Sequence, residues 1–190
     1  SEATGSMIVD IGGGTTEIAV MSLGGVVFSK SLRVAGDAMD AGIISYMRKK
    51  FNLLIGESTA EKIKKEIGTA IPTSNNVFLM KGRDIRTGTP KEISLTEEDA
   101  CEALMPILSQ MLSAIKEALE NTPPELSADL VDMGLVLTGG GALLKNIDKL
   151  ISKDTGLPVT IADNPLECVA LGTGKALENE ELFSTMLSEY

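Results

Sequence analysis

Two short apolar runs separated by glycines open the chain. Residues 7–11 and 16–21 are rich in Ile, Val and Met, a composition typical of β-strands. The turn between them contains Gly12, Gly13 and Gly14. Without side chains this turn can adopt positive φ and bring backbone N–H groups close to a ligand, and successive N–H groups in such a turn form an anion nest. The pattern predicts a hairpin whose turn binds phosphate, although a plain glycine-rich turn would have the same sequence.

Polar side chains flank this glycine turn on both sides. Asp10 ends the first apolar run, and Thr15 and Thr16 follow the glycines. A carboxylate at the mouth of a phosphate-binding turn can hold hydrated Mg²⁺, which tends to keep its waters. We therefore expect Asp10 to hold magnesium and the two threonines to add hydroxyl donors.

The next segments predict one strand and two helices. After Gly24 and Gly25, residues 26–34 alternate loosely and predict a third strand, which completes an antiparallel meander. Apolar residues then recur at helical spacing to about Lys50, with Asp37 as the expected N-cap. Residues 58–61 form the pattern of a capping box, with Ser58 as N-cap and Glu61 at N3.

The helix that this capping box predicts ends near Gly68 and has a charged outer face. That face contains Glu61, Lys62, Lys64 and Lys65. Glu61 and Lys64 are three residues apart and therefore share one side of the helix. They either contact a ligand or belong to a solvated face. Residues 76–80 and 91–95 follow and predict a small sheet.

The longest predicted helix begins at Thr96 and ends at Asn121. Its apolar residues form one broad stripe: Leu104, Ile107, Leu108, Met111, Leu112, Ile115 and Leu119. Pro106 lies inside this stretch, which predicts a kink or a delayed start because proline has no N–H for the helix.

A second glycine motif follows the long helix. Residues 134–138 predict a strand, and Gly139, Gly140, Gly141 and Ala142 come directly after it. Apolar residues at helical spacing begin at Leu143, so a ligand could lie against the glycine backbone at a helix N-terminus. Residues 159–161 then predict a strand, and Pro165 at N1 predicts a last helix. These elements together predict an α/β fold, a mixed sheet flanked by helices with a small α+β insertion.

Composition excludes several classes of function. The 190 residues carry a net charge of −10, which argues against nucleic-acid binding through a basic surface. The chain has no histidine, which excludes Ser–His and Cys–His catalysis and histidine-bound metals. Cys101 and Cys168 fit no metal-binding spacing and are expected to be reduced core thiols, as suits a cytosolic protein. No apolar run reaches transmembrane length.

Three segments together carry a resemblance to a known superfamily. Residues 10–17 resemble the second phosphate loop of the actin, sugar-kinase and chaperone ATPase superfamily, residues 137–142 resemble its adenosine loop, and residues 169–174 its second connecting helix. The order and spacing of the three also match. Within the superfamily, residues 55–64 and 137–144 most resemble the MreB family, the bacterial actins of rod-shape determination.

The resemblance implies an actin-like ATPase fold, which is ribonuclease H-like. It implies an inner nucleotide-binding subdomain formed by residues 1–35 and 96–190 and an outer small subdomain formed by residues 36–95. The family's first phosphate loop and water-polarising glutamate have no counterpart in this sequence. The chain therefore resembles the C-terminal half, and the missing N-terminal half of the same protein is an expected partner.

The resemblance also implies ATP and Mg²⁺ as cofactors and gives roles to the matching residues. Asp10 would hold Mg²⁺ through water, and Thr15 would position the attacking water. The glycines of the first motif would donate N–H groups to the β- and γ-phosphates, the charged helix would reach the ribose or adenine, and the second motif would pack under the nucleoside. The implied cofactor-binding residues are Gly12, Gly13, Gly14, Thr15, Glu61, Lys62, Lys64, Gly139, Gly140, Gly141 and Ala142.

The implied function is that of a cytoskeletal ATPase. It would form homopolymeric filaments in the cytoplasm, at the inner face of the membrane, and guide wall synthesis with membrane-associated partners. With one half of the site missing, this chain alone is expected to bind ATP very weakly and to show no turnover. The alternatives are a divisome actin such as FtsA, half of a chaperone ATPase, or a non-enzymatic interaction fragment.

Overall fold

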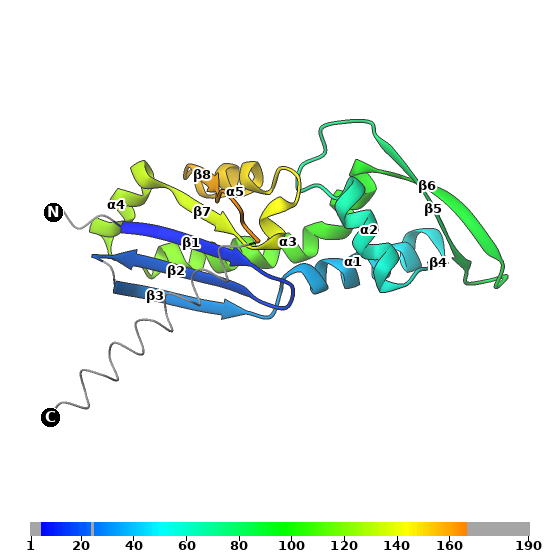
Figure 1. Ribbon diagram of the computed structural model, residues 1–190, viewed down its shortest axis with the longest axis horizontal. Coiled ribbons are helices and arrows are strands. Elements are labelled where there is room, and N and C mark those ends of the chain that lie inside the picture. The colour runs from blue at the N-terminus through cyan, green and yellow to red at the C-terminus, as the bar shows by residue number, and fades with distance from the viewer. Residues whose placement is uncertain (1–4, 24, 167–190) are drawn as a thin grey trace, which may run out of the picture.

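A mixed five-stranded sheet forms one end of the described part of the molecule (Figure 1). The computed structural model describes residues 5–23 and 25–166. The strands lie in the order β3-β2-β1-β7-β8, and their bounds are β1 Gly5–Ile11, β2 Thr16–Ser22, β3 Gly25–Leu32, β7 Leu135–Thr138 and β8 Val159–Ile161. Neighbours β1, β2 and β3 pair antiparallel, whereas β1, β7 and β8 pair parallel. The predicted meander and mixed sheet are confirmed.

The parallel pairing of β1 and β7 brings the two glycine motifs together. Val9 pairs with Leu137, and Asp10 pairs with Thr138, the last residue of β7. Both strands therefore end at the same edge of the sheet, and each is followed by its glycine motif. In open α/β sheets, ligands bind at the carboxyl ends of parallel strands. This topology therefore places both motifs where a ligand is expected.

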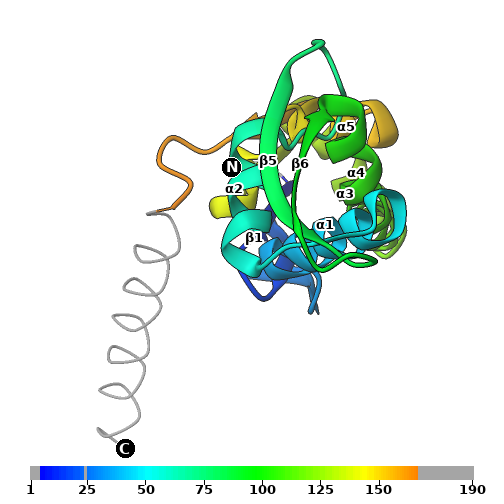
Figure 2. The ribbon, with the colours of Figure 1, turned by 90° about the vertical axis from the view of Figure 1, so that its right-hand side faces the viewer.

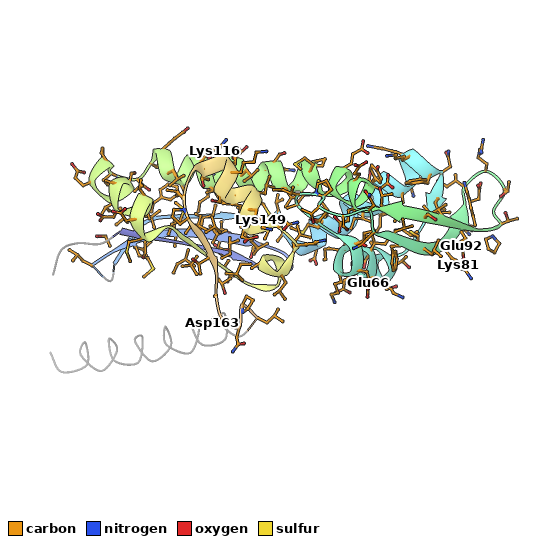
Figure 3. All side chains as sticks on the ribbon, turned by 90° about the horizontal axis from the view of Figure 1, so that it is seen from above. Glu66, Lys81, Glu92, Lys116, Lys149 and Asp163 are labelled. Atoms are coloured by element: carbon orange, nitrogen blue, oxygen red, sulfur yellow. The ribbon has the colours of Figure 1, made fainter. Side chains whose placement is uncertain are left out.

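A three-stranded antiparallel sheet forms the opposite end (Figure 2). Its order is β4-β5-β6, with β4 at Leu53–Leu54, β5 at Val77–Asp84 and β6 at Pro90–Thr96. Strands β5 and β6 confirm the predicted small sheet. Strand β4 is only two residues long, which is too short for a periodic signal in the sequence. Near the far end of this sheet, Lys81 Nζ and Glu92 Oε2 are 3.6 Å apart (Figure 3).

One long helix connects the two sheets. The helices are α1 Gly36–Phe51, α2 Glu57–Ile67, α3 Glu97–Glu120, α4 Pro124–Met133 and α5 Ile147–Thr155, with a 3₁₀ turn, η1, at Gly140–Leu143. Helix α3 contacts β2 and β3 at one end and β6 at the other, and its residues Leu104, Leu108 and Ile115 are buried. The apolar stripe predicted for this helix therefore packs into one continuous hydrophobic core, which also includes Met7 and Val9.

The N-terminus of α1 is capped by backbone rather than by a side chain. The N–H groups of Gly36 and Asp37 donate to the carbonyls of Gly12 and Gly13 at 3.1 and 2.8 Å. The predicted N-cap at Asp37 was wrong, since the helix begins at Gly36 and no side chain caps it. The first glycine motif takes that role, because its carbonyls reach the N–H groups that every helix leaves unsatisfied.

The predicted capping box was also wrong. Helix α2 begins at Glu57 after Gly56, and no side-chain cap is present, so Ser58 lies inside the first turn. A true capping box occurs at α3, where Thr96 Oγ1 accepts from the Asp99 N–H at 3.2 Å and Asp99 Oδ2 accepts from the Thr96 N–H at 3.0 Å. The reciprocal bonds fix the start of the longest helix.

Three other expectations differ from the structure. Helix α3 runs through Pro106 from Glu97, so its start is not delayed. Helix α4 was not predicted. The helix expected from Leu143 begins at Ile147, because the intervening residues form η1 and a short extended segment.

Some predictions fall outside the described residues. These are the body of the helix expected from Pro165, the resemblance at residues 169–174 and Cys168. Cys101 is a buried free thiol, and its Sγ lies 3.5 Å from the carbonyl of Ala70. Within residues 5–23 and 25–166, no helix has the length and apolar character needed to cross a membrane.

Candidate functional site

A cleft of about 750 Å³ opens where the two glycine motifs meet α1 and α2. We call residues 12–15 the first glycine loop and residues 139–143 the second glycine loop. The residues that line the cleft are Gly12, Gly13, Gly36, Asp37, Met39, Asp40, Glu57, Ser58, Glu61, Lys64, Lys65, Glu66, Gly68, Gly140, Gly141, Leu143, Leu144, Lys145 and Leu166. The cleft thus joins segments that are far apart in the sequence.

The first glycine loop is fixed through its carbonyls and leaves N–H groups free. Gly12 N donates to Thr15 O at 2.9 Å, which closes the turn, and the Gly12 and Gly13 carbonyls cap α1. Among the described residues, the N–H groups of Gly13, Gly14 and Thr15 have no acceptor. All three residues are exposed. The loop therefore offers adjacent N–H donors on a rigid support, which is the requirement for an anion nest.

Two expectations for this loop were wrong. None of its three glycines adopts positive φ; the turn obtains its shape from the hydrogen bonds to α1 instead. Thr16 is buried, and its hydroxyl donates to the carbonyl of Val34 at 2.7 Å. It is therefore not a donor for a ligand, whereas Thr15 is exposed.

Asp10 has a buried oxygen without a partner. Its Oδ1 makes no hydrogen bond with the described residues, and it lies against Gly139, where an added Cβ would be 2.3 Å away. Burial, and then the negative charge of Glu17, raise the pKa of Asp10 above its usual 3.8. A buried polar atom without a partner is costly, so this carboxylate suits a cation or a cation's water.

Among the described residues, no all-protein metal cage surrounds Asp10. Within residues 5–23 and 25–166, no three acidic, cysteine or histidine side chains come together as metal ligands. Magnesium does not need such a cage, because it commonly uses one or two carboxylates together with waters and substrate phosphates. The arrangement therefore fits Mg²⁺ beside the first glycine loop.

The second glycine loop supports the cleft and also lines it. Gly139 has a φ of +81°, and its N–H donates to the carbonyl of Pro165 at 2.8 Å. Ala142 is fully buried and donates its N–H to the Gly139 carbonyl at 3.1 Å. Gly140 and Gly141 line the cleft directly. Of the predicted residues, Gly140 and Gly141 therefore face the cleft, whereas Gly139 and Ala142 support the loop.

Lys64 is the most strongly constrained charged residue of α2. Its Nζ lies 2.9 Å from Asp40 Oδ1 and donates to Asp40 Oδ2 at 3.0 Å and to the Gly36 carbonyl at 3.2 Å. Less than a fifth of either side chain is exposed. This pair joins α2 to α1, and thereby to the first glycine loop, in the wall of the cleft.

Two other charged residues of α2 that were predicted as site residues, Glu61 and Lys62, lie on different sides of the helix. Glu61 lines the cleft and pairs with Lys65 at 2.7 Å, and the hydrogen bond from Lys65 lowers the pKa of Glu61 below its usual 4.5. Lys62 does not line the cleft, and its Nζ lies 5.9 Å from the centre of the Phe78 ring. Lys62 was predicted together with Glu61 and Lys64, but the structure places it outside the residues that line the cleft.

Sequence reasoning did not identify several of the cleft residues, among them Asp37, Asp40 and Lys145. Asp37 was expected only as a cap, Asp40 was not singled out, and Lys145 was placed inside a predicted helix. Asp37 and Asp40 are three residues apart on α1, a helical spacing that could have identified them. Lys145 carried no local signal.

Comparison with known proteins decides the family. The model of the MreB/Mbl protein family matches residues 1–185. The chain belongs to the MreB/Mbl family. The resemblance of its glycine motifs to this family is therefore confirmed.

Curated MreB and Mbl proteins are similar over nearly all of this chain. The cell shape-determining protein MreB of Escherichia coli (strain K12) is 53% identical over 179 residues, which cover 94% of this chain and 52% of the relative. The cell shape-determining protein Mbl of Bacillus subtilis (strain 168) is 45% identical, with 94% and 54% covered. The chain therefore spans about half the length of these curated relatives.

Solved structures show the same fold. MreB5 of Spiroplasma citri bound to AMPPNP superposes with a TM-score of 0.88 at 40% identity, covering 95% of this chain and 56% of that one. The MamK double helical filament has a TM-score of 0.70 at 22% identity, covering 85% and 50%. The predicted actin-like α/β fold is confirmed.

Proposed function

We propose that this MreB/Mbl-family chain is the C-terminal, nucleotide-binding half of a bacterial actin-like ATPase that forms filaments and directs rod cell shape and wall synthesis. The observation that carries the proposal is the meeting of both glycine loops in one cleft, at the carboxyl edge of parallel β1 and β7. The relative bound to AMPPNP, a nucleotide analogue, gives further support.

The first glycine loop is the proposed phosphate site. The free N–H groups of Gly13, Gly14 and Thr15 would donate to the β- and γ-phosphates, and hydrogen bonds to charged acceptors are the strong ones. Gly12 contributes by closing the turn. Asp10 would hold Mg²⁺ through water, since its buried Oδ1 has no hydrogen-bond partner among the described residues. Bound Mg²⁺ would neutralise charge on the phosphates during phosphoryl transfer.

Thr15 and α2 have the remaining proposed roles in the site. The exposed hydroxyl of Thr15 would position the attacking water. Glu61 and Lys64 would reach the ribose or adenine from one wall of the cleft, and Gly140 and Gly141 would pack under the nucleoside from the other. Positioning and charge stabilisation account for most of phosphoryl-transfer catalysis, so no side-chain nucleophile is required.

The domain division also enters the proposal. Residues 1–35 and 96–190 would form the inner subdomain and residues 36–95 the outer one, which agrees with the separation of the two sheets. The N-terminal half of the same protein would complete the ATP site, and copies of the whole protein would assemble. The filaments would work in the cytoplasm, at the inner face of the membrane, with membrane-associated proteins of wall synthesis.

The test is nucleotide-dependent assembly of the full-length protein. Light scattering and phosphate release are followed with ATP in the presence of Mg²⁺ and in the presence of a chelator. We expect assembly and hydrolysis only with Mg²⁺. Absence of both, in a folded full-length protein that also fails to bind ATP, would overturn the proposal. Residues 1–190 alone serve as the matched half-site and should show no measurable turnover.

A further inference from the structure

The buried carboxylate of Glu97, which contacts the cleft-lining residue Lys145, accepts hydrogen bonds from two separate segments. Glu97, the first residue of α3, is 2% exposed. Its carboxylate accepts from Thr73 N at 2.8 Å, from Ser74 N at 3.0 Å and from Ser74 Oγ at 2.7 Å. It also pairs with Lys145 Nζ at 2.5 Å. These bonds lower the pKa of Glu97 to about 2, and that from Lys145 contributes most.

The backbone next to Lys145 is bonded to the same segment. Lys145 O accepts from Ala70 N at 2.8 Å, and Thr69 and Lys145 form a parallel β-bridge. Asn146 has a φ of +62°, and its Nδ2 donates to the Ile71 carbonyl at 2.9 Å. We call Glu97, Lys145, Asn146 and residues 69–74 the floor latch. Residues 69–74 are therefore held at one end by the backbone around Lys145 and at the other by Glu97.

The floor latch lies where the two walls of the cleft meet. Lys145 comes two residues after η1, and both Leu144 and Lys145 line the cleft. On the other side, α2 ends at Ile67, and Gly68 lines the cleft immediately before the latch segment begins. The latch thus connects the end of one wall to the end of the other.

The first glycine loop has its own support at the N-terminus of α1, which the Lys64–Asp40 pair connects to α2. Its carbonyls bond to the N-terminus of α1, and no hydrogen bond in the described structure joins residues 12–15 to the latch. A change in the latch should therefore alter the spacing between α2 and the second glycine loop while leaving the first loop in place. A buried polar network that is only partly satisfied is unfavourable, so the loss of one charge should disturb the floor latch.

We propose that the Glu97–Lys145 pair is a positioning element that sets the spacing of the two walls around the nucleoside of a bound nucleotide. This inference rests on the proposed nucleotide site. Glu97 does not line the cleft, so it acts through Lys145 and residues 69–74. The pair therefore governs affinity for the nucleoside and has little influence on affinity for the phosphates.

The test compares a nucleotide with a ligand that has phosphates alone. Calorimetry on the full-length protein measures binding of Mg·ATP and of magnesium tripolyphosphate to wild type, Glu97→Gln, Lys145→Met and the double variant. We expect each single change to weaken ATP binding about tenfold, which is about 1.4 kcal/mol, and to change tripolyphosphate binding less than about twofold. The double variant should bind ATP no more weakly than the single variant with the lower affinity, because the two residues act as a unit.

Two further variants separate positioning from other roles. Lys145→Arg keeps the charge and should retain most of the ATP affinity. Lys116→Met removes the exposed Lys116–Asp154 pair, whose Nζ–Oδ2 distance is 2.9 Å, and should leave both affinities unchanged. Lys116 is a residue of α3, and Figure 3 shows it on the opposite side of the molecule from Glu66, a residue of α2 that lines the cleft.

Three results would overturn the inference. If the binding of ATP and the binding of tripolyphosphate weakened equally, the variants would have damaged the cleft as a whole. An effect of Lys145→Met without one of Glu97→Gln would indicate direct contact between the lysine and the ligand. Unchanged ATP affinity in both variants would show that the pair sets no spacing. Wild-type protein that binds no ATP would instead refute the proposed function, on which the inference depends.

Discussion

Gly139 is the position where a single methyl group should do the most damage to the site. Its φ of +81° and ψ of +169° lie in a region that essentially only glycine adopts, and an L-residue there costs on the order of 1–3 kcal/mol. An added Cβ would also lie 2.3 Å from Asp10 Oδ1 and 2.5 Å from the Ile11 carbonyl oxygen. Overpacking of this kind typically costs about 1–3 kcal/mol. We therefore expect Gly139→Ala to destabilise the chain by about 3–4 kcal/mol, within the sum of these two ranges.

Gly156 provides a control with positive φ but without the crowding; its ψ of +4°, unlike that of Gly139, places it in the left-handed α region. Its φ is +75°, yet nothing lies within 4 Å of an added Cβ. Gly156→Ala should therefore cost only the strain, about 1–2 kcal/mol. Urea unfolding of the 190-residue chain, analysed by linear extrapolation, measures both variants. Equal losses of stability would refute the reasoning, because they would show that Asp10 and Ile11 do not crowd Gly139.

Two other predictions concern charged groups. In the full-length protein, Lys64→Ala should weaken ATP binding about tenfold, because it removes the tie to Asp40 in the cleft wall, whereas Lys62→Ala should have little effect; equal effects by calorimetry would favour a solvated face. Glu97 has its pKa lowered from 4.5 to about 2, so its ionised form contributes on the order of 3 kcal/mol of stability. That contribution is complete above about pH 4.5 and is lost as the pH falls toward 2. In Glu97→Gln, the free energy of unfolding measured with urea should vary less with pH between about pH 5 and 3 than in wild type. An unchanged pH dependence would contradict this assignment.

The strands and both glycine loops could be predicted because their signals are local. Apolar runs of Ile and Val predict strands wherever they occur, and glycines directly after such runs mark turns at the strand ends. The pairing of β1 with β7 was not predicted, because more than 120 residues separate them and no local pattern specifies that register.

The caps and the cleft floor could not be predicted in the same way. Asp37 has the residue type of an N-cap, but the carbonyls of a distant loop take the helix N–H groups first. The spacing of Leu143, Leu144 and Ile147 predicts a continuous helix, yet Asn146 at positive φ interrupts it to reach Ile71. Lys145 and Glu97 are 48 residues apart. Each failure reflects a tertiary contact that overrides a local preference.

The direct test of the nucleotide site is the dependence of hydrolysis on Asp10. Phosphate release from Mg·ATP is measured for full-length wild type, for Asp10→Ala, and for Asp132→Ala as an exposed control on α4. Loss of the carboxylate that orients the metal should remove several kcal/mol of transition-state stabilisation, so we predict a rate at least about 100-fold lower. Circular dichroism should show an intact fold, and Asp132→Ala should match wild type. Hydrolysis by Asp10→Ala within about threefold of wild type, less than 1 kcal/mol of barrier, would contradict the account.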